Sequence, residues 1–103
     1  MSTQVIFIQL CQQAGLGSPQ TEYRFCPDRK FLFDYAFPDK MVAVEQEGGI
    51  YTKQAHGSIT GILRDIEKYN LAASLGWRVL RIEPSKLFKT ETIELIKKTL
   101  TYK

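Results

Sequence analysis

Hydrophobic residues recur along the chain with two different periods, and each change of period predicts a boundary between elements. A spacing of three to four residues indicates a helix that buries one face, whereas strict alternation indicates a strand. Glycine and proline residues stand between the periodic stretches, where they end helices or turn the chain. In chain order the signals predict a helix from the N-cap Ser2 to Gln12 or Ala14, strands within 21–37 broken by a turn at 27–30, a strand at 41–47, a helix at 60–75, a strand at 77–82 and a helix from Thr90.

The order α-β-β-β-α-β-α predicts an α/β fold with a single domain over residues 1–103. Three meandering strands, a crossover helix and a further strand make one mixed β-sheet flanked by helices. No repeat, low-complexity stretch or linker divides the chain. The crossover helix is expected to bury an apolar stripe made of Ile62, Ile66, Tyr69, Ala73 and Leu75.

Composition narrows the class of protein. Of the 103 residues, 44% are hydrophobic and 24% are charged, which is too apolar for a disordered chain. No apolar stretch approaches the roughly 20 residues of a membrane span, and the run at residues 5–10 lacks the basic leader of a signal peptide. Two cysteines make no disulfide framework, so we expect a reduced, intracellular, soluble domain. The formal net charge of +3 permits an anionic partner without requiring one.

Acidic residues inside apolar strands are the candidate chemistry. Asp34 lies in an aromatic strand, and Glu45 and Glu47 lie two residues apart on the next strand, on a shared face. If these strands pair through the turn at 38–40, Asp34 lies beside Glu45, and three carboxylates converge with no basic residue in either strand core. Such a cluster suits Mg²⁺ or Mn²⁺, which activates water for attack on a phosphoryl group. A solvated strand face is the alternative interpretation.

A longer ordered pattern surrounds these carboxylates. It consists of Arg24-Phe25, Phe33 to Pro38, Val42 to Gly49, His56, Asp65, Lys68 to Asn70 and Gly76 to Arg81. This pattern, which lies within about residues 21–83, resembles the PD-(D/E)XK nuclease superfamily. Within the superfamily it is similar to the endonucleases related to very-short-patch repair, whose small stand-alone members are often encoded by phages and prophages.

The resemblance implies metal-dependent hydrolysis of nucleic-acid phosphodiester bonds with Mg²⁺ or Mn²⁺. By this resemblance, Asp34 and Glu45 would hold the metal through their carboxylates, and the backbone carbonyl of Gln46 would be a third ligand. Glu47 stands where the superfamily usually has lysine, so it would act instead as a direct base or as an extra metal ligand. Lys68, on the crossover helix, could supply the positive charge that is missing at Glu47.

Four further residues are weaker candidates. His56, the only histidine, would donate a proton to the leaving oxygen or contact a phosphate, or it has no role in a surface loop. Lys53 in the same loop, Arg64 on the crossover helix and Arg24 near a strand turn are candidate contacts to the DNA backbone. For Arg64, a solvated helix face is the alternative interpretation.

Taken together, these residues predict an endonuclease that hydrolyses DNA, guided by DNA structure or weakly specific for sequence. Its expected context is repair, recombination or junction processing, in the cytoplasm or nucleoid of a bacterial host cell. DNA is the expected partner, a homodimer is possible for an enzyme of this size, and no membrane contact is expected. The alternative is a catalytically inactive nuclease-fold module that binds nucleic acid or a protein partner, because Glu47 replaces the lysine and the net charge is modest.

Overall fold

The computed structural model describes residues 1–47 and 59–102. Its elements follow the predicted order α-β-β-β-α-β-α, which confirms the α/β fold class. They are α1 (Thr3–Gln13), β1 (Gln20–Arg24), β2 (Leu32–Phe37), the 3-10 turn η1 (Pro38–Lys40), β3 (Val42–Gln46), α3 (Ile59–Ser74), β4 (Arg78–Ile82), the 3-10 turn η3 (Pro84–Lys86) and α4 (Thr90–Thr101).

Local signals set the boundaries of these elements. The hydroxyl oxygen of Ser2 accepts a hydrogen bond from the Val5 amide at 3.2 Å and caps the start of α1. After α3, Gly76 adopts a φ of 91°, a conformation that glycine reaches without steric cost, and the chain turns directly into β4. Pro38 begins the 3-10 turn between β2 and β3.

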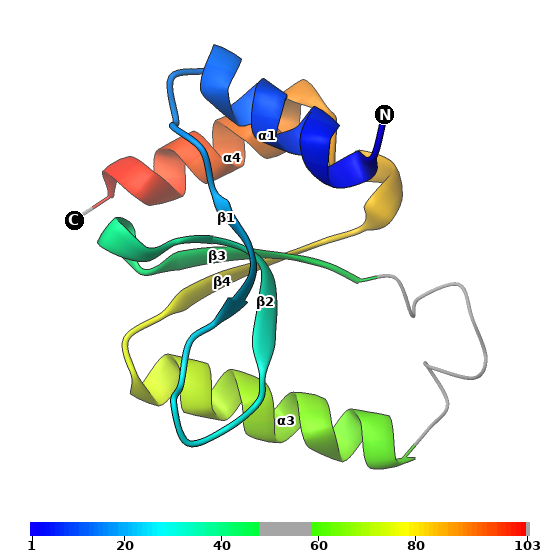
Figure 1. The fold of residues 1–103 in the computed structure, drawn as a ribbon, viewed down its shortest axis with the longest axis vertical. Helices are drawn as coiled ribbons and strands as arrows, with labels where there is room; N and C mark the ends of the chain where they lie inside the picture. The colour runs from blue at the N-terminus through cyan, green and yellow to red at the C-terminus, as the bar shows by residue number, and fades with distance from the viewer. Residues whose placement is uncertain (48–58, 103) are drawn as a thin grey trace.

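Among the described residues, four strands form one mixed sheet in the order β1-β2-β3-β4. The β1–β2 and β2–β3 pairs are antiparallel, whereas β3 and β4 are parallel. Parallel neighbours need a crossover connection, and α3 supplies it on one side of the sheet. Figure 1 shows α1 and α4 on the opposite side. In the described part of the chain, no helix is long and apolar enough to cross a membrane.

The sheet separates two hydrophobic clusters. On the side of α1 and α4, the buried members are Phe7, Cys11, Tyr35, Phe37, Val44, Ile82, Leu87, Ile93 and Ile96. On the side of α3, they are Phe25, Cys26, Phe31, Phe33, Ala36, Ala43, Ala72 and Trp77. The alanines in this second cluster have little volume, so they permit a close approach of α3 to the centre of the sheet. This approach brings polar residues of α3 within reach of β3.

Helix α3 presents a different stripe to the sheet from the one predicted. It buries Ala72 and partly buries Lys68, Tyr69 and Leu71. The predicted stripe was wrong except for Tyr69, and its exposed members are Ile62, Ile66, Ala73 and Leu75. The physical reason is that Lys68 and Tyr69 both bind the carboxylate of Glu45 on the sheet, and a hydropathy pattern does not detect a buried polar contact.

Candidate functional site

The regular pairing of strands β2 and β3 ends at Asp34 and Glu45. The register pairs Tyr35 with Val44, so Asp34 and Glu45 occupy the next position along the two strands. The amide of Asp34 donates to Oε2 of Glu45 at 2.7 Å, and the amide of Gln46 donates to Oδ2 of Asp34 at 2.8 Å. Each carboxylate thus takes the place of a carbonyl acceptor on the neighbouring strand. The predicted placement of Asp34 beside Glu45 is confirmed.

Strand β2 is distorted at Asp34. Strict alternation would place Phe33 on the same side as Tyr35, yet these two side chains lie in opposite hydrophobic clusters. On β1, Glu22 is opposite Asp34 in the register and has a left-handed φ of 47°. Such a conformation is uncommon for a residue with a side chain, and local distortion of this kind often accompanies a functional site. Phe33 and the Glu45 carboxylate consequently both lie toward α3.

The carboxylate of Glu45 is buried, with 4% of the residue exposed, and it receives two donors from α3. Its Oε1 pairs with the ammonium of Lys68 and accepts a hydrogen bond from the Tyr69 hydroxyl at 2.9 Å. A buried charge is tolerated only when it is paired and hydrogen-bonded, and these contacts meet that requirement. Burial and the negative charge of Glu45 raise the pKa of Tyr69 far above its ordinary value, so its hydroxyl remains a donor.

Glu47 follows β3 directly and has a cationic partner of its own. Its carboxylate pairs with the guanidinium of Arg81 on β4. That guanidinium also lies over the ring of Tyr69, 4.3 Å from the centroid, and its hydrogen bond to Glu47 raises the pKa of Arg81. In the parallel register Arg81 is the partner of Glu45, so this second pair is directly beside the first.

The predicted convergence of three carboxylates is only partly present. Asp34 and Glu45 are adjacent, but Glu47 is engaged by Arg81. In the two described stretches, 1–47 and 59–102, no three His, Cys, Asp or Glu side chains are grouped so as to hold a metal ion. Cations reach the carboxylates from α3 and β4, because the tertiary fold brings Lys68 and Arg81 to strands that carry no basic residue in their cores.

Asp34, Glu45 and Gln46 nevertheless fit a hard divalent cation as a partial ligand set. Mg²⁺ usually takes one or two protein carboxylates, keeps several waters and adds phosphate oxygens of the substrate. A carboxylate offers about four lone-pair positions, and among the described residues the oxygens of Asp34 accept one hydrogen bond, from the Gln46 amide. The carbonyl and amide of a strand residue point to the same side, so the Gln46 carbonyl is directed to the β2 side, as its amide is.

Of the remaining predicted residues, Arg24 and Arg64 are described, and their contacts are made away from this carboxylate pair. The guanidinium of Arg24 donates to the carbonyls of Cys26, Pro27 and Arg29 at 3.3, 2.8 and 2.9 Å, so it holds the turn between β1 and β2. Arg64 lies over the ring of Phe31, 5.8 Å from its centroid. Contacts of Arg24 and Arg64 with DNA stay predictions. His56, Lys53 and the Gly48-Gly49 pair lie outside the described residues.

Tyr69 and Arg81 are site residues for which the sequence predicted no role at the carboxylates. Tyr69 was expected only to pack within the apolar stripe of α3, whereas its hydroxyl binds Glu45. Arg81 is a charged residue between Leu80 and Ile82 on a short apolar strand. One signal could have identified Arg81. It is a cation on the strand that was expected to run beside the Glu45 strand, at a position where the side chain alternates to one face.

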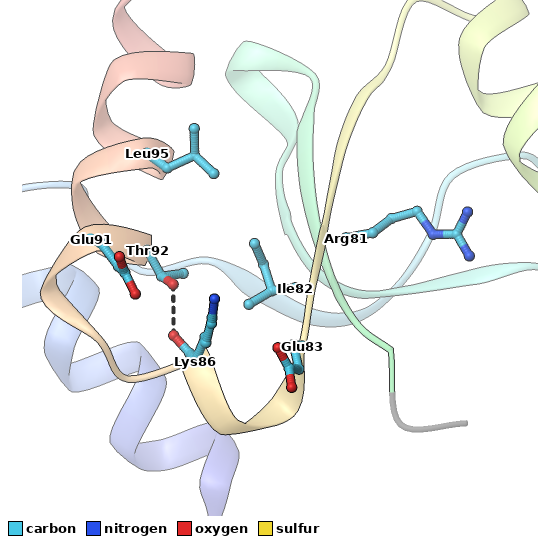
Figure 2. A pocket seen from close by; sticks show the side chains of 7 residues that line it. All are labelled: Arg81, Ile82, Glu83, Lys86, Glu91, Thr92 and Leu95. Atoms are coloured by element: carbon cyan, nitrogen blue, oxygen red, sulfur yellow. Dashed lines mark hydrogen bonds between the residues drawn. The ribbon is translucent and has the colours of Figure 1, made fainter. Parts of the chain in front are cut away.

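A separate pocket of about 380 Å³ lies between the end of β4, η3 and the first turns of α4. Figure 2 shows the Arg81 side chain pointing away from the other residues that line this pocket. Thr92 is buried there, and its hydroxyl donates to the carbonyl of Lys86 at 2.6 Å. Because Arg81 and Ile82 alternate along β4, this pocket and the carboxylate pair are on opposite sides of the sheet.

Comparisons of the chain with models of protein families, with curated proteins and with solved structures find no match. The class of this protein therefore rests on its fold, which is an α/β domain with a mixed sheet flanked by helices. The resemblance to PD-(D/E)XK nucleases stays a prediction from the sequence.

Proposed function

We propose that this protein is a metal-dependent endonuclease that hydrolyses phosphodiester bonds of DNA. The observation that carries the proposal is the placement of Lys68 on the buried carboxylate of Glu45, directly beside Asp34. Two carboxylates and a lysine at one end of a sheet are the groups that the nuclease motif requires. Here the lysine comes from α3, and the position that the motif assigns to lysine holds Glu47.

Each residue of this group has a definable task. Asp34, Glu45 and the carbonyl of Gln46 would hold Mg²⁺ or Mn²⁺. When bound, the metal would polarise a phosphoryl oxygen and would lower the pKa of the water that it binds. Lys68 has three N–H donors, and within residues 1–47 and 59–102 one of them binds Glu45, so we propose that the others orient a water or a phosphate oxygen. Tyr69 restrains the Glu45 carboxylate through its hydrogen bond.

Within the nuclease class, we propose cutting that is guided by DNA structure or is weakly specific for sequence. The corresponding roles are repair, recombination or junction processing in the cytoplasm or nucleoid of a bacterial cell, with a homodimer as the proposed assembly.

One observation favours a second candidate function, a catalytically inactive module that binds nucleic acid or a protein partner. Both Glu45 and Glu47 already have cationic partners from the protein itself. In such a module the carboxylates would stabilise the fold and would need no metal. The two candidates therefore differ in whether divalent cations support cleavage.

A cleavage assay tests the proposal. The full chain is incubated with supercoiled plasmid, linear duplex, a four-way junction or single-stranded DNA, in Mg²⁺, Mn²⁺ or EDTA. Asp34→Asn keeps the shape of the side chain but removes its charge, and Asp39→Asn, on the exposed turn η1, is the matched control. We expect metal-dependent cleavage by the wild type and by Asp39→Asn, and at least about a 100-fold loss in Asp34→Asn, typical of losing a residue that acts in the transition state.

The same assay contains the outcomes that contradict the proposal. Full activity in Asp34→Asn would show that Asp34 is not part of the catalytic site. If the wild type cuts none of these substrates in either metal, the nuclease proposal fails. DNA binding without cleavage and without a need for metal would support the inactive module.

A further inference from the structure

Arg81 lies between the candidate metal ligands and solvent. Its guanidinium lies over the Tyr69 ring, and the Tyr69 hydroxyl in turn binds Glu45. The side chain of Arg81 is 47% exposed, whereas that of its partner Glu47 is 24% exposed. One face of the guanidinium is thus covered by an aromatic ring, while nearly half of the Arg81 side chain remains open to solvent.

This environment suits a change of partner. A guanidinium has five donors in a planar fork that matches a carboxylate and a phosphate equally well. The ion pair with Glu47 is partly exposed, and such pairs are weak because water and salt screen them. Stacking on Tyr69 holds Arg81 in place whichever anion it binds.

When Arg81 changes its partner, Glu47 also becomes able to bind a different partner. It lies two residues after Glu45, at a spacing that places both side chains on the same side of an extended strand. The electrostatic influence of both glutamates on Tyr69 agrees with this placement. Released from Arg81, the Glu47 carboxylate would be available as a third anionic ligand, in addition to Asp34 and Glu45, for a divalent metal.

We propose that Arg81 exchanges Glu47 for a phosphate group of the nucleic acid, and that the released Glu47 completes the ligand set of the divalent metal. The inference rests on the proposed function, since it concerns the same site. It adds regulation to that site, because phosphate binding and metal binding then strengthen one another. By linkage, the coupling is the same in both directions.

Calorimetric titration of Mn²⁺ into the full chain tests whether the ion pair with Arg81 prevents Glu47 from binding the metal. We expect Arg81→Gln to bind Mn²⁺ about 5- to 20-fold more tightly than the wild type, a typical size for such coupling. Adding Glu47→Gln to that variant should remove the gain. Arg81→Met, which keeps an apolar stem over Tyr69, is a second variant for the same measurement. Circular dichroism verifies that each variant is folded.

Arg78→Gln is the matched control for the loss of one positive charge. Arg78 is on the same strand, and its guanidinium donates to the carbonyl of Tyr102 near the end of α4. An equal gain of Mn²⁺ affinity in Arg78→Gln would show a general charge effect and overturn the exchange. Unchanged or weaker affinity in Arg81→Gln, or no Mn²⁺ binding by any of the proteins, would also overturn it. Binding that is detectable only when Arg81 is replaced supports it.

A second titration measures the coupling to phosphate. Ca²⁺ replaces Mn²⁺ as an oxygen-binding cation, and its affinity is measured with and without a short DNA duplex. The duplex should tighten Ca²⁺ binding at least about 5-fold in the wild type and not in Arg81→Gln. Equal tightening in both proteins overturns the exchange. A wild type that cuts DNA but shows no coupling refutes the exchange alone, whereas coupling without cleavage refutes only the nuclease.

Discussion

The amide of Asp34 donates a hydrogen bond to Oε2 of Glu45 at 2.7 Å, directly beyond the last β2–β3 pair, Tyr35 with Val44. The carboxylate of Asp34 in turn accepts from the amide of Gln46 at 2.8 Å. The backbone of two strands thus positions both carboxylates before any ligand binds. Groups held on rigid strands are more exact in position than groups on loops, as a metal site requires.

The buried pair of Lys68 and Glu45 should make a large contribution to stability when only one partner is removed. Lys68→Met leaves the Glu45 carboxylate buried without its cation, and we expect a loss of about 3 kcal/mol in the free energy of unfolding. In a double-mutant cycle by urea denaturation, Lys68→Met combined with Glu45→Gln should cost less than the sum of the single changes. Additive costs would show that the two groups do not interact.

The hydroxyl of Tyr69 should contribute to stability through the Glu45 carboxylate. Tyr69→Phe removes a hydrogen bond to a charged acceptor, which typically costs about 1.5–3 kcal/mol. Tyr102→Phe is the matched control, since Tyr102 is 72% exposed, and its cost should stay within about 0.5 kcal/mol. Urea denaturation measures both, and equal effects would contradict the role of the buried hydrogen bond.

A lysine at position 47 should not improve this protein, although the nuclease motif usually has one there. Glu47→Lys would face Arg81 with a like charge and remove the carboxylate that we propose as a ligand. We expect cleavage to fall at least about tenfold, the effect of losing roughly 1.4 kcal/mol of transition-state stabilisation. Equal or higher activity would show that Glu47 merely replaces the lysine and that Lys68 is not the required cation.

The buried thiol of Cys11 should make stability depend on pH in alkaline solution. Burial raises the pKa of Cys11 from its ordinary value of 9.0 to about 11, so the folded protein holds this proton longer than the unfolded chain does. The contribution is fully present below pH 9 and is lost toward pH 11, by at most about 1.4 kcal/mol per pH unit. The free energy of unfolding, measured between pH 8 and 10, should fall less steeply for Cys11→Ala. The same slope in both proteins would refute this origin.

The orientation of α3 can be tested by two substitutions on different sides of the helix. Ala72→Leu adds volume to a fully buried position and should cost about 1–3 kcal/mol. Ile66→Ser, at a side chain that is 52% exposed, should cost about 1 kcal/mol or less. Thermal denaturation measures both. The reverse ranking would indicate that the helix buries the stripe expected from its hydropathy pattern.

Most of the fold follows from signals within short stretches of the sequence. The turn at Pro38–Lys40 connects two strands with clear β patterns, so their antiparallel pairing was predictable. Once this pairing is assumed, the neighbouring positions of Asp34 and Glu45 follow by counting along the strands. The crossover helix and the parallel strand β4 were predictable for a similar reason, because the chain must cross the sheet between parallel strands.

The sequence by itself thus determined the α/β architecture and the meeting of Asp34 with Glu45, because both depend on local periodicity and one short turn. The tertiary structure alone decided which cations bind the glutamates. Lys68 is 23 residues from Glu45, and Arg81 is 34 residues from Glu47. Their contacts depend on the rotation of α3 and the register of β4, which are set by packing of the whole core and by the need to pair a buried charge. Hydrophobic periodicity contains no information about such pairing, so the apolar stripe of α3 was predicted on the wrong side.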